Sequence, residues 1–307
     1  MTARLRQTGP TDGAGRLWHA PRLLLAAASL FWAGNFIVGR AVHGTVPPFG
    51  LAFWRWTGSL VLVLGFAWPH LRRDAAVLRR HWPVLLLLSG LGVSAYSALT
   101  YLGLQSTTAI NALLLQSAMP LVILVWCFAL FGERARPLQL AGIVVSLAGV
   151  AVIVTRGTPQ LLLAFALGPG DPWVLVAVLS YALYSTLLRK RPPVHPLSFL
   201  AASFAFGAAL LLPLYLWEHL SGAPTRPSAA GLLAIGYLAL FPSCLAYMFY
   251  NRGVELIGPT RAGQFFHLMP VFGTVLAVLL LGEPFEWFQG LGFVLIAAGI
   301  GLTGLRA

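Results

Sequence analysis

The sequence predicts an all-α membrane protein with ten transmembrane helices, built as two inverted-topology five-helix repeats. Three observations lead to this fold class. Of the 307 residues, 58% are hydrophobic and 9% charged, and the mean hydropathy is +0.82. Apolar segments of about 20 residues, the length that crosses a bilayer, recur along the chain. One pattern of residues also occurs twice at a fixed separation. A soluble domain carries roughly 25% charged residues, so a soluble helical protein is disfavoured.

The connections between the apolar segments are short, except for the link between residues 156 and 171. That link contains an apolar stretch, 161–167, which is too short to cross and is expected at the interface. The first segment follows a polar, basic N-terminus; a signal peptide is the alternative, but the length of the segment favours a retained helix. The ten predicted spans are 22–42, 49–69, 83–104, 108–131, 137–155, 172–189, 197–217, 230–250, 259–281 and 286–304.

Lys and Arg residues predict the orientation of these spans. If the N-terminus is cytoplasmic, sixteen of them fall on that side and only Arg40, Arg156 and Arg226 on the other. Such a bias is typical of cytoplasmic loops. We therefore expect a multi-pass protein of the cell (inner) membrane with both termini on the cytoplasmic side. Because these basic residues alternate with spans, the net charge of +12 indicates topology and not nucleic-acid binding. The two cysteines lie within spans and are expected to pack there.

An internal repeat divides the chain. From Gly103 to Gly149, thirteen of the 47 positions are identical to the residue 150 positions later. We therefore expect a cytoplasmic tail over 1–21, a first repeat over 22–155, an inter-repeat loop over 156–171 and a second repeat over 172–304. The matching residues are Met119-Pro120, Gly132-Glu133, Gln139, Gly142 and Gly149 in the first copy, and Met269-Pro270, Gly282-Glu283, Gln289, Gly292 and Gly299 in the second.

Five spans per repeat is an odd number, so the second copy enters the membrane from the opposite side. Inverted repeats allow a transporter to exchange outward-open and inward-open states around a site near the midplane. The architecture thus predicts transport by alternating access. This prediction rests on the inverted repeat and not on any reactive side chain.

The chain resembles the drug/metabolite transporter superfamily, and within it the ten-helix bacterial EamA-type permeases. The resemblance rests on Trp32-Ala33-Gly34-Asn35-Phe36, on Arg55 and on the doubled Pro, Gly-Glu, Gln-x-x-Gly, Gly pattern, and it covers roughly residues 22–304. It implies a carrier of amino acids or other small metabolites, with export favoured. It also implies that spans 1, 3, 4, 6, 8 and 9 surround a central cavity and that spans 5 and 10 are peripheral.

Polar and aromatic side chains at mid-span positions are the candidates for lining that cavity. A small amphipathic solute suits an apolar cavity with a few polar groups, and interhelical packing is the alternative for each residue taken singly. The candidates are Trp32, Asn35, Tyr96, Thr100, Gln116, Tyr181, Tyr184, Tyr247, Gln264 and His267.

Four residues raise more specific alternatives. Pro120 and Pro270 each remove a backbone donor within a span, and so form either a tolerated kink or a bend that flexes during gating. His267 lines the cavity, bonds a neighbouring helix or carries a proton. Arg55 either extends its side chain to the interface or holds a substrate carboxylate or a carbonyl.

No catalytic residue, metal or cofactor is expected, and the partners expected are a small-molecule substrate and the lipid bilayer, with a homodimer left open. All eight Asp and Glu residues lie in tails, loops or span ends, so no intramembrane carboxylate is available for proton coupling. Two other functions remain as alternatives. One is an intramembrane enzyme with a Ser94–His267 dyad, which needs hydrogen-bond contact between the two side chains. The other is a passive lipid or ion pathway.

Overall fold

The computed structural model describes residues 17–158, 168–226, 228–281 and 285–304, and within these ranges it is all-helical. Eight helices are long and apolar enough to span a membrane, and Trp287–Thr303 is a shorter apolar helix. A further apolar run, residues 259–281, consists of two helices joined by a 3₁₀ turn. The predicted all-α membrane fold is therefore confirmed. The apolar patch over 161–167 and the Gly282-Glu283 turn lie outside the described residues.

The helices follow the predicted spans closely. Several begin at a proline, which suits the first helical turn because its missing N–H has no intrahelical partner there. The first repeat contains α2 (Pro21–Ala41), α3 (Pro48–Arg80), α4 (Trp82–Ser89), η1 (Gly90–Ala95), α5 (Tyr96–Leu104), α6 (Ala109–Gln116), α7 (Met119–Phe131) and α8 (Pro137–Val154). The second contains α10 (Asp171–Leu187), η2 (Leu188–Lys190), α11 (Pro196–Leu220), α12 (Ala229–Leu238), η3 (Ala239–Leu245), α13 (Ala246–Ile257), α14 (Pro259–Gly263), η4 (Gln264–His267), α15 (Leu268–Leu281) and α16 (Trp287–Gly304).

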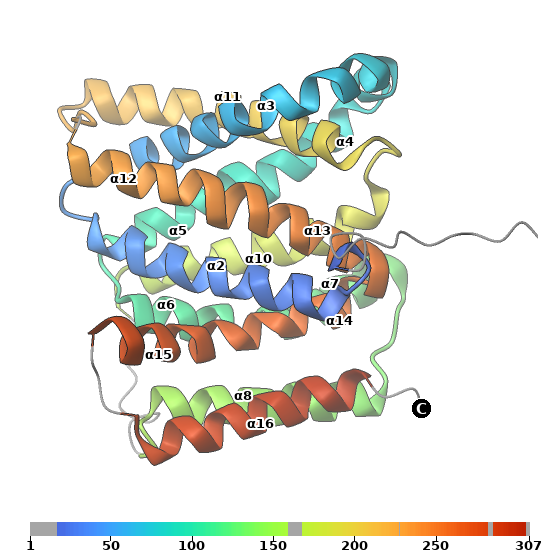
Figure 1. The fold of residues 1–307 in the computed structure, drawn as a ribbon, viewed down its shortest axis with the longest axis vertical. Coiled ribbons are helices and arrows are strands. Elements are labelled where there is room, and N and C mark those ends of the chain that lie inside the picture. The colour runs from blue at the N-terminus through green and yellow to red at the C-terminus, as the bar shows by residue number, and fades with distance from the viewer. Residues whose placement is uncertain (1–16, 159–167, 227, 282–284, 305–307) are drawn as a thin grey trace, which may run out of the picture.

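The helices lie side by side, with α2 and α10 in the middle of the bundle (Figure 1). Helices α3 and α11 pack together toward one edge, and α8 and α16 form a separate pair at the other (Figure 1). Predicted spans 5 and 10 are therefore peripheral, as the resemblance implies.

Helices α8 and α16 occupy the same place in the two repeats and run antiparallel. A Cβ atom at Gly142 would lie 2.5 Å from the carbonyl oxygen of Gly299, and one at Gly149 would lie 2.7 Å from that of Gly292. Glycine permits this close approach of two backbones. Residue 142 corresponds to residue 292 in the other repeat, and residue 149 to residue 299. The operation that relates the two repeats therefore converts one contact into the other.

Both repeats contain a π-helical turn at equivalent positions, η1 and η3. Such turns disturb the regular backbone hydrogen bonding and occur often at functional sites. Helix α3 also differs from its prediction, because it continues through Pro69 to Arg80 instead of ending near residue 69. Its added turns carry the charged residues Arg72, Arg73 and Asp74, which suit an extension beyond the apolar layer.

Candidate functional site

A cluster of aromatic rings fills the middle of the bundle, centred on Trp32 of α2. Its ring stacks on Phe266 at 5.1 Å between centroids, and meets Tyr181 edge-on at 5.6 Å and Tyr247 at 6.0 Å. Tyr96 packs on Tyr181 at 4.7 Å. All of these side chains are buried. The structure thus brings together aromatic residues predicted to line a cavity, and in this state their own rings fill the space. Tyr184 completes this predicted set and contacts Tyr181 at 5.1 Å.

The two π-helical turns supply backbone acceptors to this cluster. The carbonyl of Pro242 in η3 accepts a hydrogen bond from Trp32 Nε1 at 3.0 Å. The carbonyl of Gly92 in η1 accepts one from the Tyr247 hydroxyl. The equivalent turns of the two repeats therefore hold aromatic side chains of the same central cluster. Sequence analysis missed these turns, although Pro242 within a predicted span is a signal for disturbed helical bonding.

Arg55 lies inside the protein with 1% of its surface exposed. Its Nη1 donates to Asn35 Oδ1 at 2.8 Å and to the Tyr101 hydroxyl at 2.7 Å. Its Nε donates to Ser243 Oγ at 2.5 Å, and Nη2 to the Pro242 carbonyl at 3.3 Å. The alternative in which Arg55 reaches the interface is wrong. The reason is that α3 turns this residue toward α2, α5 and η3, where neutral acceptors surround the guanidinium.

His267 meets its own repeat equivalent. Its Nε2 donates to the Ser117 carbonyl at 2.9 Å, and the two residues are 150 positions apart. Nδ1 of His267 has no partner among the described residues. The amide groups of Gln116 and Gln264 and the hydroxyl of Thr100 are likewise buried without a described partner. Buried polar groups are usually paired, so these side chains stay candidates for contact with a solute.

Pro120 and Pro270 both follow interrupted helices. Helix α6 ends at Gln116 and α7 begins at Met119, and in the second repeat the 3₁₀ turn η4 precedes α15. Each proline lacks the N–H that would continue an α-helical hydrogen bond. The break leaves the Ser117 carbonyl available to His267.

Ser94 and His267 form no dyad. Ser94 Oγ donates to the Gly207 carbonyl at 2.9 Å, whereas His267 bonds Ser117. Because a dyad requires hydrogen-bond contact between nucleophile and base, the geometry gives the enzyme alternative no support.

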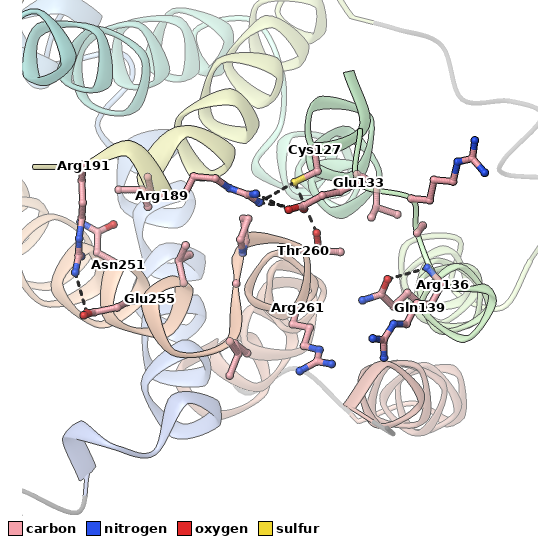
Figure 2. A pocket seen from close by; sticks show the side chains of 18 of the residues that line it. Cys127, Glu133, Arg136, Gln139, Arg189, Arg191, Asn251, Glu255, Thr260 and Arg261 are labelled. Carbon is pink, nitrogen blue, oxygen red and sulfur yellow. Dashed lines mark hydrogen bonds and ion pairs between the residues drawn. The ribbon is translucent and has the colours of Figure 1, made fainter. Parts of the chain in front are cut away.

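A cavity of about 1000 Å³ lies at one end of the bundle, between the ends of α7 and α13, the turn η2 and the start of α14 (Figure 2). Arg189 and Glu133 point toward each other there, 2.5 Å apart, and Arg191 reaches Glu255 at 2.9 Å (Figure 2). The hydrogen bond from Arg189 holds the pKa of the Glu133 carboxyl below its ordinary value. The sequence does not reveal this cavity, because its arginines also fit the positive-inside pattern of cytoplasmic loops.

The cavity approaches the aromatic cluster through Asn251. This residue lines the cavity and is 5% exposed. Its Oδ1 accepts a hydrogen bond from the Tyr184 hydroxyl at 2.9 Å, whereas Nδ2 has no described partner. Tyr184 in turn packs on Tyr181. The side chains of Asn251 and Tyr184 therefore lie between the open cavity and the Tyr181 ring.

A family model and curated relatives both indicate a transporter. A sequence model of the EamA-like transporter family matches residues 21–155 and 168–305. An uncharacterized transporter of Archaeoglobus fulgidus is 30% identical, over 92% of this chain and 96% of the relative. The uncharacterized inner membrane transporter YedA of Escherichia coli K12 is 28% identical, over 98% and 93%. A solved crystal structure superposes with a TM-score of 0.75 at 24% identity, over 93% of this chain and 96% of the other, and supports the fold.

Proposed function

Because the chain belongs to the EamA-like transporter family, within the drug/metabolite transporter superfamily, we propose that it is a secondary carrier of the inner membrane. It moves a small metabolite, an amino acid or a related compound, by alternating access around the central aromatic cluster. Export is the favoured direction. Its partners are the solute and the surrounding bilayer.

The observation that carries this proposal is that repeat equivalents meet each other in the bundle. His267 bonds Ser117, and Ser146 Oγ bonds the Ile296 carbonyl at 3.3 Å; both pairs are 150 residues apart. Residues related by a two-fold operation touch only where the axis passes between them. An axis through the bundle lets the two halves exchange conformations and open a central site to either side.

The positions of the arginines support an inward-open state. Arg134, Arg136, Arg189, Arg191 and Arg261 line the cavity, and all five belong to the side that the positive-inside pattern assigns to the cytoplasm. With both termini cytoplasmic, the cavity receives solute from the cytoplasm. That arrangement fits an exporter at its loading step.

Counterflow in proteoliposomes tests this function. Vesicles are preloaded with a mixture of unlabelled amino acids, and uptake of each labelled amino acid is followed with and without a pH gradient. A carrier exchanges at least one labelled solute without a gradient. Accumulation only with a gradient assigns proton coupling. Absence of counterflow for every amino acid contradicts the amino-acid proposal, and flux that does not depend on a preloaded solute indicates a passive pathway.

A further inference from the structure

Arg55 is a buried cation that no described carboxylate accompanies. Its four hydrogen-bond partners, Asn35, Tyr101, Ser243 and the Pro242 carbonyl, are all neutral. The face of Trp56 lies 4.7 Å from its guanidinium carbon. These groups satisfy N–H donors, but they do not neutralise the charge.

The described acidic residues are engaged elsewhere or lie away from the centre. Asp171 accepts hydrogen bonds from Thr107 and Gly168, and Glu218 accepts them from the first turn of α3. Asp74 accepts from the His195 backbone. Glu133 and Glu255 form their ion pairs in the cavity, and Glu286 is exposed near the start of α16.

A buried charge without a counter-charge is strongly unfavourable, and an ionisable residue at membrane depth usually marks a substrate or ion pathway. Arg55 also lies beside the solute site proposed above. Its Nη2 and Trp32 Nε1 donate to the same carbonyl, that of Pro242. The guanidinium and the aromatic cluster are therefore adjacent parts of one region.

The neutral partners of Arg55 have alternative bonds if an anion replaces them. Ser243 Oγ also donates to the Leu238 carbonyl at 2.7 Å, and the Tyr101 hydroxyl also donates to Asn35 Oδ1 at 2.8 Å. A carboxylate can thus take two N–H donors of the guanidinium fork, the arrangement that Arg favours, without leaving these hydroxyl donors unpaired.

The cavity independently favours an anionic solute. Its lining includes five arginines, Arg134, Arg136, Arg189, Arg191 and Arg261, and two glutamates, Glu133 and Glu255. Clefts lined by an excess of one charge concentrate solutes of the opposite charge. Asn251 in the lining of this cavity accepts a hydrogen bond from Tyr184, which packs in the aromatic cluster beside Arg55.

We propose that the transported solute bears a carboxylate, and that Arg55 is the counter-charge that binds this group while the aromatic cluster holds an apolar remainder. The inference rests on the proposed carrier function. A single guanidinium balances a single negative charge, so a monocarboxylate fits better than a doubly charged phosphate.

Thermal stability of the purified full-length protein tests the binding step without requiring transport. The probes are L-phenylalanine, L-leucine, phenylacetate and isovalerate, each compared with its carboxamide. We expect at least one carboxylate to raise the Tm and its carboxamide not to. Arg55→Gln removes this rise, whereas Arg55→Lys keeps the charge but loses the fork and binds about tenfold more weakly. Arg72→Gln, at an exposed arginine over Trp68, is the matched control and keeps the rise.

The proposal is overturned if no carboxylate raises the Tm, if carboxamides act equally, or if Arg55→Gln responds like the wild type. Counterflow of the same probes separates this inference from the carrier function. Arg55-dependent binding without counterflow contradicts the carrier and leaves the carboxylate site standing. Counterflow that accepts carboxamides equally supports the carrier and contradicts the carboxylate site. A folded Arg55→Lys protein keeps the comparison valid if Arg55→Gln fails to fold.

Discussion

His267 Nε2 lies 2.9 Å from the carbonyl oxygen of Ser117, the residue that occupies the same place in the other repeat. The contact joins the interrupted helices of the two halves, between η4 and the break that separates α6 from α7. It lies where a two-fold axis relating the repeats must pass. The hydrogen bond therefore joins the two repeats at the axis about which the proposed alternating access operates.

His267 is expected to act as a neutral donor that positions the two broken helices. His267→Gln can keep an N–H near the position of Nε2, whereas His267→Leu leaves the Ser117 carbonyl unpaired at a cost of about 1–3 kcal/mol. We expect the leucine variant to have a clearly lower Tm and the glutamine variant to retain most counterflow with an unchanged pH profile. A glutamine variant that loses its response to a pH gradient would instead make His267 a proton carrier.

The glycines between α8 and α16 are expected to be required for packing. In Gly142→Ala the new methyl group meets the Gly299 carbonyl, and such overpacking costs roughly 1–3 kcal/mol. Gly301→Ala on α16 is the matched control, because a Cβ there meets nothing within 4 Å. It should be neutral or stabilising by up to about 1 kcal/mol. Thermal unfolding in detergent measures both, and equal Tm values for the two variants would contradict the packing.

Trp32 is expected to contribute through its indole N–H as well as its ring. Trp32→Phe keeps an aromatic ring beside Phe266 but loses the hydrogen bond to Pro242, which contributes about 0.5–1.5 kcal/mol. Counterflow should weaken by up to about tenfold in apparent affinity. Trp68→Phe, at a half-exposed position in α3, should behave like the wild type. Wild-type affinity in Trp32→Phe would show that the indole donor is dispensable.

The Glu133–Arg189 pair is expected to add little stability, because the two side chains are 50% and 28% exposed. A double-mutant cycle with Glu133→Gln and Arg189→Gln should give a coupling of about 0.2–1 kcal/mol at pH 7. Because the folded-state pKa of Glu133 is lowered, this stability is present above the ordinary carboxyl pKa of about 4.5 and is lost as the pH falls through the lower folded value. Coupling that persists after full protonation at still lower pH would contradict the ionic interpretation.

Periodicity and the repeat predict most of the fold because they depend on the chain alone. The spans follow from them, and the prolines Pro120 and Pro270 predict the disturbed helices. The peripheral place of α8 and α16 is implied only by the family resemblance. The burial of Arg55 does not follow from the sequence, because it depends on how α3 is rotated against α2, α5 and η3. The paired π-helical turns and the cavity also escape sequence analysis, since each needs neighbours distant in the chain.

Cysteine accessibility at one pair of repeat equivalents tests alternating access most directly. Val254 lines the cavity that is open in this structure and is 6% exposed, whereas its equivalent Leu104 is fully buried. In a background with Cys127 and Cys244 replaced, Val254→Cys and Leu104→Cys are labelled by a membrane-impermeant maleimide from either side of sealed vesicles. We predict that Val254→Cys reacts only from the cytoplasmic side and Leu104→Cys only from the other. A bulky label on Val254→Cys should then suppress the reaction of Leu104→Cys in the double variant. Labelling of both from one side, or independent labelling of the two, would contradict alternation about the axis.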